Sequence, residues 1–414
     1  MSFWKRKIAT FMISQTISLL GSSLVMYAIM WHVTLSTQSG SMMLIMVLTT
    51  FIPSLLLTPF AGVWADRINR RFLIIAADLL IALVTLLVAI LLIFNIRDLW
   101  ILFIVSVIRA IGQAIHQPAV SAVYPQIVPK DKLIKVQGIA QGIQSASFVA
   151  MPLIAGLLLT MFPIEYILFI DVITAFIAVT ILLIFVKLPR HIGEVNDTKI
   201  HYFADMKDGI RYAKSHPFVF SVLTFSFLFM IMVAAPSFLS YLQVARVFGD
   251  EPWRLSLLEA FFGAGMLIGS ILISFWGGFK NRLITFFFAY IFIGVGTILL
   301  GIPFNYYFYI SMWSMVGFFI AISNPVIVGL IQEKVDPAYI GRVFSVFSLI
   351  NTVSMPLGMI VFGPLADVIN VSHIILVAGI MMGIIAIVPL FNKRLLKEGK
   401  KAPKVSAEEL SKIS

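Results

Sequence analysis

Residues 72–95, FLIIAADLLIALVTLLVAILLIFN, contain a single charged side chain, Asp78, in an otherwise apolar run. A hydrocarbon core of about 30 Å requires on the order of 20 apolar residues of helix. Backbone N–H and C=O groups inside lipid must bond within their own segment, so such a run has to be helical. This stretch therefore predicts a transmembrane helix.

Runs of the same kind recur along the chain, near residues 8–32, 41–65, 99–123, 136–161, 165–187, 216–243, 255–276, 283–301, 304–331, 340–366 and 373–391. With residues 72–95 they make twelve predicted spans. The composition agrees, because 60% of the residues are hydrophobic and 12% are charged, whereas about a quarter are charged in a soluble domain. We therefore expect an all-α integral membrane protein with twelve transmembrane helices.

The positive charges indicate how these spans are oriented. Of the 30 Lys and Arg residues, all but Arg97, Arg109, Arg246 and Arg254 lie on the side of the two termini. Because cytoplasmic loops carry the excess of Lys and Arg, we expect a multi-pass protein of a bacterial inner membrane with both termini in the cytoplasm. This topology, with attraction to anionic lipid, explains the net charge of +11, and nucleic-acid binding is not expected.

An internal repeat divides the chain. Ala114, Ile115, Pro118 and Val128 recur 207 residues later as Ala321, Ile322, Pro325 and Val335, and parts of 149–153 recur at 353–357, an offset of 204 after a three-residue deletion. Chance identity is the alternative, but the prolines and the polar loop are not generic. Each repeat holds an even number of spans, so the two are related by an axis along the membrane normal.

Four parts of the chain follow from this repeat. They are an N-terminal six-helix half at 1–187, a cytoplasmic linker at 188–215, a C-terminal six-helix half at 216–391 and a cytoplasmic tail at 392–414. The tail is rich in Lys and Glu, and we expect it to be disordered. Cysteine is absent, which excludes disulfides, thiolate metal sites and a Cys nucleophile.

The loop after the second predicted span has the sequence Gly62-Val-Trp-Ala-Asp66-Arg67-Ile-Asn69-Arg70-Arg71. It resembles the signature of the major facilitator superfamily, in which Gly, then Asp with a basic residue, then Gly and two basic residues join spans 2 and 3. Asn69 stands where the family usually has Gly. Since Asn tolerates the left-handed conformation, we expect the turn to be kept.

The resemblance implies the major facilitator fold, with a substrate site between two six-helix halves. It also implies a cytoplasmic latch made of Gly62, Asp66, Arg67, Asn69, Arg70 and Arg71. In this latch Asp66 meets the N-terminal end of span 11, and the arginines meet carboxylates or lipid phosphates. Simple charge anchoring would explain the arginines but not the Gly–Asp spacing. We expect Asp78 to be a structural partner of the arginine cluster.

Two further motifs resemble sequence patterns of particular members of this superfamily. Residues 105–112, ending in Arg109-Ala-Ile-Gly112, resemble the family's span-4 arginine motif with the Gly one residue early. Ser147, Met151-Pro152 and Ala155-Gly156 resemble a weakened form of the Gly-Pro motif of antiporters. The chain as a whole resembles the macrolide-efflux branch of proton-coupled drug exporters, chiefly at 4–7, 257–269 and 339–345.

Ionisable residues within the spans are candidates for proton coupling, because a charge in the hydrocarbon costs at least about 2.5–3.5 kcal/mol. Arg109 lies near the middle of span 4 and Asp171 lies in span 6, where the two can pair. The alternative is a static ion pair that holds the N-terminal half together. Glu259 of span 8 is a second proton or cation site, or is solvated in an outward vestibule.

Uncharged polar residues share helix faces and must point away from lipid. The candidates for lining a cavity are Gln113, Gln117, Gln141, Gln144, Asn324 and Asn351. Such residues either line a watery cavity or hold helices together. A cavity is favoured for spans 4 and 11, and both interpretations stay open for span 5.

The leading hypothesis is a secondary active transporter that exports hydrophobic or amphipathic compounds, such as macrolide-like antibiotics, in exchange for protons. We expect a monomer in the lipid bilayer, without cofactor or metal. No Gly-x4-Gly-Lys-Ser/Thr loop occurs, so ATP does not drive it directly. A lysophospholipid or siderophore transporter is the alternative. A membrane-embedded enzyme or a sensor without transport is remote, because the six histidines are scattered and no catalytic residue is expected.

Overall fold

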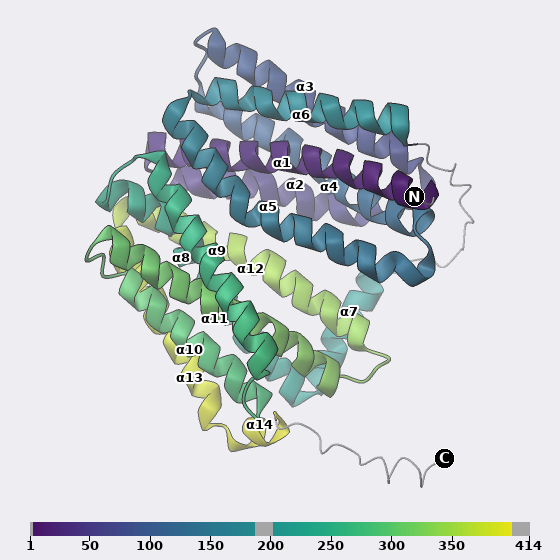
Figure 1. Cartoon of the computed structure of the whole chain (residues 1–414). Coiled ribbons are helices and arrows are strands. Elements are labelled where there is room, and N and C mark those ends of the chain that lie inside the picture. Colours follow the sequence, from purple (N-terminus) through teal and green to yellow (C-terminus); the bar gives the residue numbers. More distant parts are fainter. Residues whose placement is uncertain (1–2, 187–201, 400–414) are drawn as a thin grey trace. The chain divides into compact units, whose positions relative to one another are not determined.

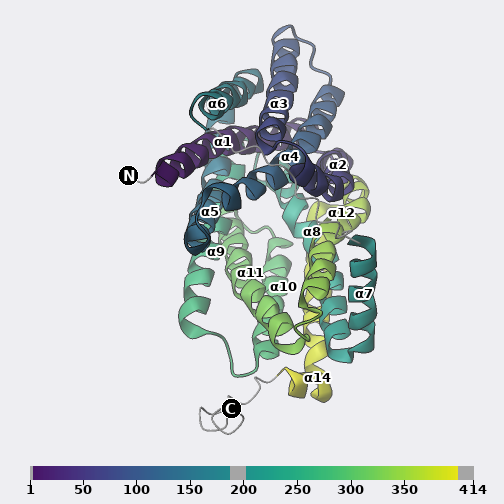
Figure 2. The same ribbon diagram turned by 90° about the vertical axis from the view of Figure 1, so that its right-hand side faces the viewer.

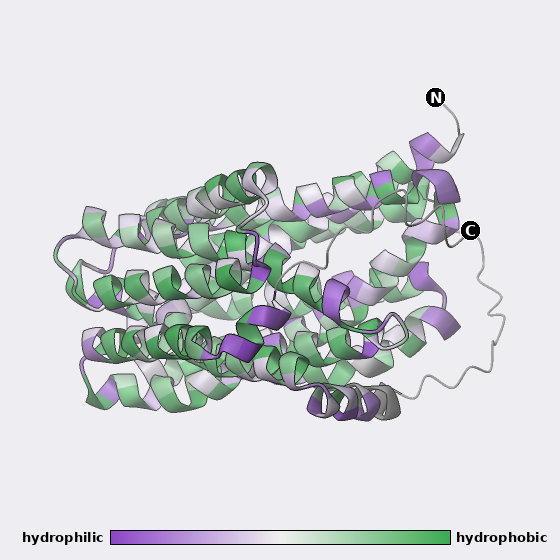
Figure 3. Cartoon of the chain, turned by 90° about the horizontal axis from the view of Figure 1, so that it is seen from below, coloured by the Kyte–Doolittle hydropathy of each residue, from purple (hydrophilic) through white to green (hydrophobic). Residues whose placement is uncertain are grey.

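The computed structural model describes residues 3–186 and 202–399, and all regular elements in these residues are helices. Twelve of the described helices are long and apolar enough to cross a membrane, which confirms the predicted fold class. They are α1 (Phe3–Thr37), α2 (Gly40–Arg67), α3 (Arg70–Ile93), α4 (Leu99–Ile127), α5 (Leu133–Met161), α6 (Ile164–Phe185), α8 (Pro217–Val247), α9 (Pro252–Trp276), α10 (Arg282–Leu300), α11 (Tyr306–Lys334), α12 (Ile340–Val368) and α13 (Val371–Ile387). In Figure 3 these ribbons are mostly green, the colour of hydrophobic residues, along their length.

Short helices complete the described chain. They are η1 (Lys130–Lys132), α7 (Tyr202–Ser215), η2 (Val388–Phe391) and α14 (Lys393–Glu398). Part of the predicted linker thus forms helix α7, and the start of the predicted tail forms α14 rather than disordered chain. Residues 400–414 of that tail, residues 188–201 of the linker and residue 187 before it lie outside the described residues.

The chain divides into two compact units, which we describe separately. The first contains Met1–Tyr202, Ser237–Gly263 and Pro356–Ile374, and the second contains Phe203–Pro236, Ala264–Met355 and Ile375–Ser414. The first unit therefore holds α1–α6 together with one end each of α8, α9, α12 and α13. The boundaries predicted for the two six-helix halves stay predictions.

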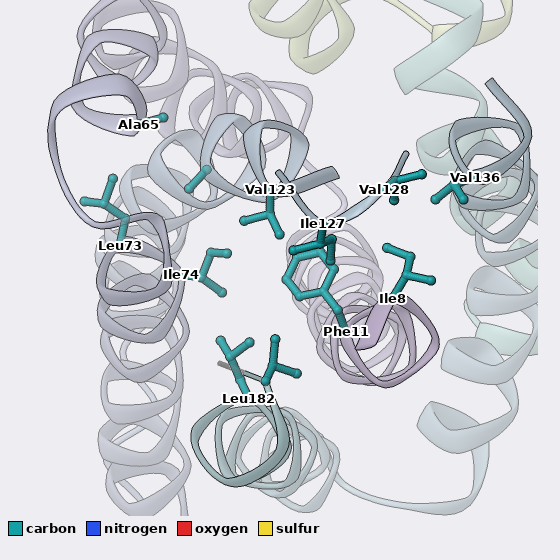
Figure 4. Packing of buried hydrophobic residues seen from close by; sticks show 12 residues of the cluster. Ile8, Phe11, Ala65, Leu73, Ile74, Val123, Ile127, Val128, Val136 and Leu182 are labelled. Atoms are coloured by element: carbon teal, nitrogen blue, oxygen red, sulfur yellow. The ribbon is translucent and has the colours of Figure 1, made fainter. Parts of the chain in front are cut away.

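In the first unit, α1 packs between α5 and α6 (Figures 1 and 2), and α4 packs against α2 and α3. A cluster of buried aliphatic and aromatic side chains fills the end of this bundle where α1 begins and α4 ends. Ile8, Phe11, Ile74, Val123 and Leu182 lie in it, and Figure 4 shows them converging from α1, α3, α4 and α6. Phe11, Ile74, Val123 and Leu182 are fully buried.

The outward faces of the same helices are apolar as well. Leu83 and Leu87 of α3 are 64% and 55% exposed, and Phe176 of α6 is 71% exposed. Large side chains of this kind would favour aggregation in water but suit contact with lipid tails. The helices are therefore apolar both towards the core and towards the surroundings, as expected for membrane spans.

In the second unit, α10 and α11 pack closely along their length. Helix α7 contacts the loop before α12, where the Tyr212 ring stacks on Tyr339 at 4.5 Å between ring centroids. The Tyr212 hydroxyl accepts a hydrogen bond from the Asp336 N–H at 3.1 Å. The Asn281 side chain donates to the carbonyl of Leu396 at 2.8 Å, which fixes α14 at the start of α10.

The internal repeat extends to the ends of the helices. Helices α4 and α11 begin and end with the same offset as the repeated prolines, and so do α5 and α12. The first residues of α9 and α10 follow those of α2 and α3 by a slightly larger offset, 212 in both pairs (40 to 252 and 70 to 282), although the helices of each pair differ in length. The capping residues repeat too: Asp98 and Asn305 accept from the first turns of α4 and α11, and Asn69 and Asn281 accept from those of α3 and α10.

Two details of the sequence interpretation are wrong. The shorter offset inferred after a deletion is not a structural equivalence, because α5 and α12 have equal lengths, and Pro152 and Pro356 lie three positions apart within them. Asn69 is not in the left-handed conformation, since its φ is −59°. Its side chain instead accepts a hydrogen bond from the Arg71 N–H at 3.0 Å, so the turn uses a capping side chain where glycine would rely on backbone freedom.

Candidate functional site

The charged pair of the first unit lies where α1, α3, α4 and α6 meet. The Arg109 guanidinium is bonded to the Asp171 carboxylate, and it also donates to the Thr85 hydroxyl at 2.6 Å and to the Ser22 carbonyl at 3.1 Å. The Ser22 hydroxyl donates to Asp171 at 2.9 Å. Arg109 and Asp171 are 7% and 1% exposed. The structure therefore brings these two candidates together in a closed, fully hydrogen-bonded group.

Two glycines let the helices approach around this pair. A Cβ on Gly21 of α1 would lie 1.9 Å from the Thr174 hydroxyl oxygen of α6. A Cβ on Gly112 of α4 would lie 2.6 Å from an Ile81 side-chain carbon of α3. Gly112 belongs to the span-4 motif, so one function of that motif in this fold is close packing of α4 on α3.

A cavity of about 340 Å³ opens between α1, α4 and α5. Its lining contains six glutamines, namely Gln15, Gln113, Gln117, Gln137, Gln141 and Gln144. Four of the six residues selected from sequence as cavity-lining are among them. The glutamines of α5 face this cavity, which favours the cavity interpretation for span 5 over the alternative of helix contacts.

The other two selected residues belong to the second unit. Asn324 of α11 is exposed, and Asn351 of α12 donates to the Phe347 carbonyl at 2.8 Å. They are the repeat equivalents of Gln117 and Gln144, each 207 residues later. These two polar positions are thus shared by both repeats, whereas Gln113 corresponds to Ile320.

Asp78 lies behind the cavity, and its partners differ from those expected. It accepts a hydrogen bond from the Ser18 hydroxyl at 2.8 Å, and His116 Nε2 lies 3.3 Å from its Oδ1. Asp78 and His116 are 3% and 7% exposed. The expectation of a partner in the arginine cluster is wrong, because Asp78 is two helical turns into α3 and faces α1 and α4.

The arginines of the expected latch cap helix ends in the first unit. Arg70 donates to the Ala65 and Ala122 carbonyls at 2.8 and 2.6 Å, and Arg71 donates to the Leu182 carbonyl at 3.1 Å. Guanidinium groups satisfy carbonyls that the ends of helices leave unpaired. Arg70 also has one of the expected carboxylate partners, because the Asp66 carboxylate lies 3.4 Å from it. Contacts of the arginines with lipid phosphates stay a prediction.

The remaining latch residues lie on or beside the end of α2. Gly62 is within α2, and Asp66 and Arg67 are exposed in its last turn. Their meeting with the start of the eleventh span stays a prediction.

Glu259 of α9 is buried, at 6% exposure, which contradicts the alternative of a solvated vestibule. Its carboxylate accepts a hydrogen bond from the Tyr241 hydroxyl of α8 at 2.7 Å. The Tyr241 ring contacts Trp31 of α1 at 6.5 Å between centroids, and Trp31 in turn contacts Tyr27. A buried acid without a paired cation in its hydrogen bonds is a group that can change protonation.

A polar network at the start of α2 was not anticipated from the sequence. Asp367 of α12 accepts from the Gly40 and Ser41 N–H groups at 2.7 and 2.9 Å, and the Arg246 guanidinium lies 3.5 Å from it. Arg246 also donates to the Gln38 and Ala366 carbonyls. The only sequence signal for this contact is the unusual placement of an acid and an arginine at span ends.

Two helix crossings of the first unit repeat the same geometry. A Cβ on Gly156 of α5 would lie 1.5 Å from Ser256 Oγ of α9, and one on Gly363 of α12 would lie 2.9 Å from the Gly40 carbonyl oxygen of α2. Gly156 and Gly363 are 207 residues apart. The span-5 motif therefore supplies a glycine for a close crossing.

Gln15 also lines the cavity but was not selected from the sequence. A glutamine within the apolar run of the first span was the signal that could have identified it. Among the described residues, no group of three His, Asp or Glu side chains could hold a metal ion.

Comparison with known proteins agrees with the fold. The profile of the Major Facilitator Superfamily matches residues 11–359. The chain is 31% identical to macrolide efflux protein A of Streptococcus pyogenes over 94% of this chain and 97% of that protein. It is 30% identical to macrolide efflux protein A of Enterococcus faecalis over 78% of this chain and 100% of that protein.

Among solved structures, the chain resembles a bacterial homologue of the human lysosomal transporter Spinster in an inward-facing, unoccupied conformation. The TM-score is 0.67 at 15% identity, over 97% of this chain and 99% of that one. A similarity at this identity supports the fold alone. Together with the matched profile and the efflux relatives, it shows that the chain belongs to the Major Facilitator Superfamily of membrane transporters.

Proposed function

We propose that this transporter exports hydrophobic or amphipathic compounds, macrolide-like antibiotics among them, in exchange for protons. The observation that carries the proposal is the 31% identity to macrolide efflux protein A along 94% of the chain. We place it in a bacterial plasma membrane with both termini in the cytoplasm, because the positive charges favour that side.

The proton-coupling part of the proposal rests on buried carboxyl groups. Asp171 can take up a proton when a rearrangement of α4 or α6 separates it from Arg109. Glu259 needs no such separation, because its hydrogen bond comes from a neutral phenol. Inward movement of protons through either group would then provide the free energy for export.

The lining of the glutamine cavity supports an uncharged or amphipathic cargo over the alternatives of the same fold. Lysophospholipids and siderophores present phosphate or carboxylate groups, which are usually bound by Arg or Lys. The lining of this cavity contains neither. The lysophospholipid or siderophore hypothesis is therefore the weaker one.

The test is the accumulation of radiolabelled erythromycin in a susceptible bacterial host that expresses the chain. We expect expression to lower accumulation and a protonophore to restore it. Asp171→Asn and Glu259→Gln are compared with Asp131→Asn, which neutralises an exposed acid of η1. Unchanged accumulation in expressing cells would refute the macrolide assignment, and export that persists with the protonophore would refute proton coupling.

If expression lowers accumulation but both buried-acid variants export normally, the proton passes through neither group. Asp78, which lies against His116 at the glutamine cavity, is then the next carboxyl to replace.

A further inference from the structure

The glutamine cavity has an unusual lining for a membrane protein. Besides the six glutamines it contains the His116 ring and the hydroxyl groups of Thr16, Ser18, Ser121 and Tyr124, but no Asp, Glu, Lys or Arg. Each carboxamide offers one acceptor oxygen and two N–H donors. The lining is therefore dense in both donors and acceptors while carrying no fixed charge.

Some of this hydrogen-bonding capacity has no partner within the protein. Gln15 is 7% exposed, and its Oε1 has no hydrogen-bond partner; its amide group reaches only the Ser14 hydroxyl, at 3.4 Å. His116 Nε2 lies 3.3 Å from the Asp78 carboxylate, whereas its Nδ1 has no hydrogen-bond partner. Buried polar atoms are almost always hydrogen-bonded. Atoms of this kind in the wall of a cavity indicate a guest that supplies both donors and acceptors.

The position of the glutamines fits a guest that is polar around its edge. Gln113 and Gln117 are one turn apart on α4, and Gln141 and Gln144 are one turn apart on α5, so two helices present carboxamides to the same space. Met12, Leu19, Val120 and Ile143 add apolar surface between them. A pyranose ring has this pattern, with hydroxyl groups at its edge and C–H groups on its faces.

The absence of charged residues from the lining and the volume of the cavity restrict the kind of guest further. An organic cation would need a carboxylate or an aromatic cage in the lining, and an anion would need Lys or Arg. Cavities that hold a drug-sized ligand measure roughly 300–1,000 Å³, so about 340 Å³ suits one sugar-sized part of a larger molecule.

We propose that this glutamine cavity binds the neutral sugar portion of a glycosylated amphipathic cargo. The proposal names a substrate class for the transport function proposed above and rests on it. The apolar body of the cargo then lies outside this cavity. Discrimination comes from the carboxamides, because a cargo without hydroxyl groups would leave them without partners on binding.

The test measures binding to the purified full-length chain in lipid nanodiscs. The two probes are a dansyl-hexyl glucoside and a matched dansyl-hexyl methyl ether that lacks the sugar. We expect the glucoside to bind at least about tenfold more tightly, the effect of one or two hydrogen bonds. Gln113→Met and Gln141→Met keep the side-chain length, remove the carboxamide and should abolish that preference.

Gln126→Met is the matched control, because Gln126 lies on the same helix, α4, but does not line the cavity. This control should keep the preference for the glucoside. Each variant is first checked for unchanged elution and melting temperature, and a variant that fails is replaced by Gln117→Met or Gln144→Met.

The outcomes separate this inference from the proposed function. Equal binding of the two probes, or a preference that survives both cavity variants, overturns the inference even if erythromycin is exported. A glucoside preference that depends on Gln113 and Gln141, in a chain that does not lower erythromycin accumulation, supports the sugar site and overturns the macrolide assignment instead.

Discussion

The middle of the first repeat contains a buried pair of opposite charges, whereas the equivalent positions of the second repeat are apolar. Arg109 of α4 and Asp171 of α6 form a buried ion pair. Their equivalents 207 residues later are Val316 of α11 and Ala378 of α13, both 1–2% exposed. Thr85, which bonds the ion pair, corresponds through the offset between α3 and α10 to Thr297, which bonds only within its own helix.

The second repeat therefore shows how this position can be packed without charge. A Cβ on Gly296 would lie 2.8 Å from Val316, and a Cβ on Gly379 would lie 2.5 Å from the Ile298 backbone nitrogen. Small residues and aliphatic side chains fill the space there. Since the fold does not need an ion pair at this position, its presence in the first repeat favours a functional role over a purely structural one.

The largest change in stability is expected among variants in which Arg109 and Asp171 are replaced by Val and Ala, the residues at the equivalent positions of the second repeat. Arg109→Val alone leaves the Asp171 carboxylate buried without its cation, which costs about 3–5 kcal/mol. The double variant Arg109→Val/Asp171→Ala removes both charges and should regain most of that loss, because apolar replacement of a buried pair is often neutral. Thermal unfolding of the purified chain measures both.

Arg394→Val is the control for this comparison. Arg394 forms an exposed ion pair with Glu398, so its replacement should change the stability of the chain little. We expect the stable double variant to lose erythromycin export. Normal export by that variant would show that the ion pair is structural, and a double variant as unstable as Arg109→Val would show that the two repeats are not interchangeable here.

A second comparison concerns the two glycine crossings, where α5 meets α9 and α12 meets α2. Gly156→Ala and Gly363→Ala should each lose about 1–3 kcal/mol through overpacking. Ser256→Gly should regain most of the loss in Gly156→Ala, because the nearest atoms to the added Cβ belong to the Ser256 side chain and only the Pro252 carbonyl oxygen, at 3.0 Å, remains. Gly363→Ala should not be rescued by Leu44→Ala, because the Gly40 carbonyl and the Leu44 Cβ remain.

Melting temperatures of the four single and the two double variants check this prediction. Rescue at both crossings, or at neither, would contradict the difference between a side-chain and a backbone contact.

The sequence predicted the spans and the repeat well, because both depend on long periodic patterns. The apolar runs identified all twelve helices, and Pro118 and Pro325 fixed the offset that the helix ends confirm. The pairing of Arg109 with Asp171 was also foreseeable, since buried charges in lipid require partners.

The environment of a side chain could not be predicted from the sequence where it depends on which helix packs against that side chain. Asp78 was assigned to nearby arginines because they are close in sequence, but its partners come from α1 and α4. Glu259 could not be classed as buried or solvated without knowing that Tyr241 covers it. Gln15 and Asp367 carry no local pattern, and their significance arises only from tertiary contacts.

The N-terminal ends of α2 and α9 are repeat equivalents that are held differently. Asp367, from another helix, accepts hydrogen bonds at the start of α2 with both carboxylate oxygens. Asp367→Asn keeps only one acceptor oxygen and should destabilise the chain by about 1 kcal/mol, the usual effect of losing one hydrogen bond. Melting temperatures of the purified chain with and without Asp367→Asn measure this effect.

Asp131→Asn controls for loss of an acid elsewhere. Equal melting temperatures with and without Asp367→Asn would mean that this contact does not stabilise the start of α2.

The smallest effect is expected at the start of α9, where Glu251 belongs to the chain segment that leads into the helix. Arg254 donates to its carboxylate at 2.7 Å and holds the pKa of Glu251 below its ordinary value. A lowered pKa means that the carboxylate stabilises the fold at neutral pH and that this contribution disappears as the pH falls through the lowered pKa. Because the group is exposed to solvent, the contribution is small.

Glu251→Gln should therefore lower the melting temperature at pH 7 by less than Asp367→Asn does, and the difference from the unmodified chain should vanish in acid. Melting curves at neutral and acidic pH measure this. A loss at pH 7 as large as that of Asp367→Asn would show that the start of α9 is held as firmly as that of α2. In that case the two helix starts would differ only in the origin of the acid. Glu251, from the segment next to α9, would stabilise its helix as much as Asp367, from a distant helix, stabilises α2.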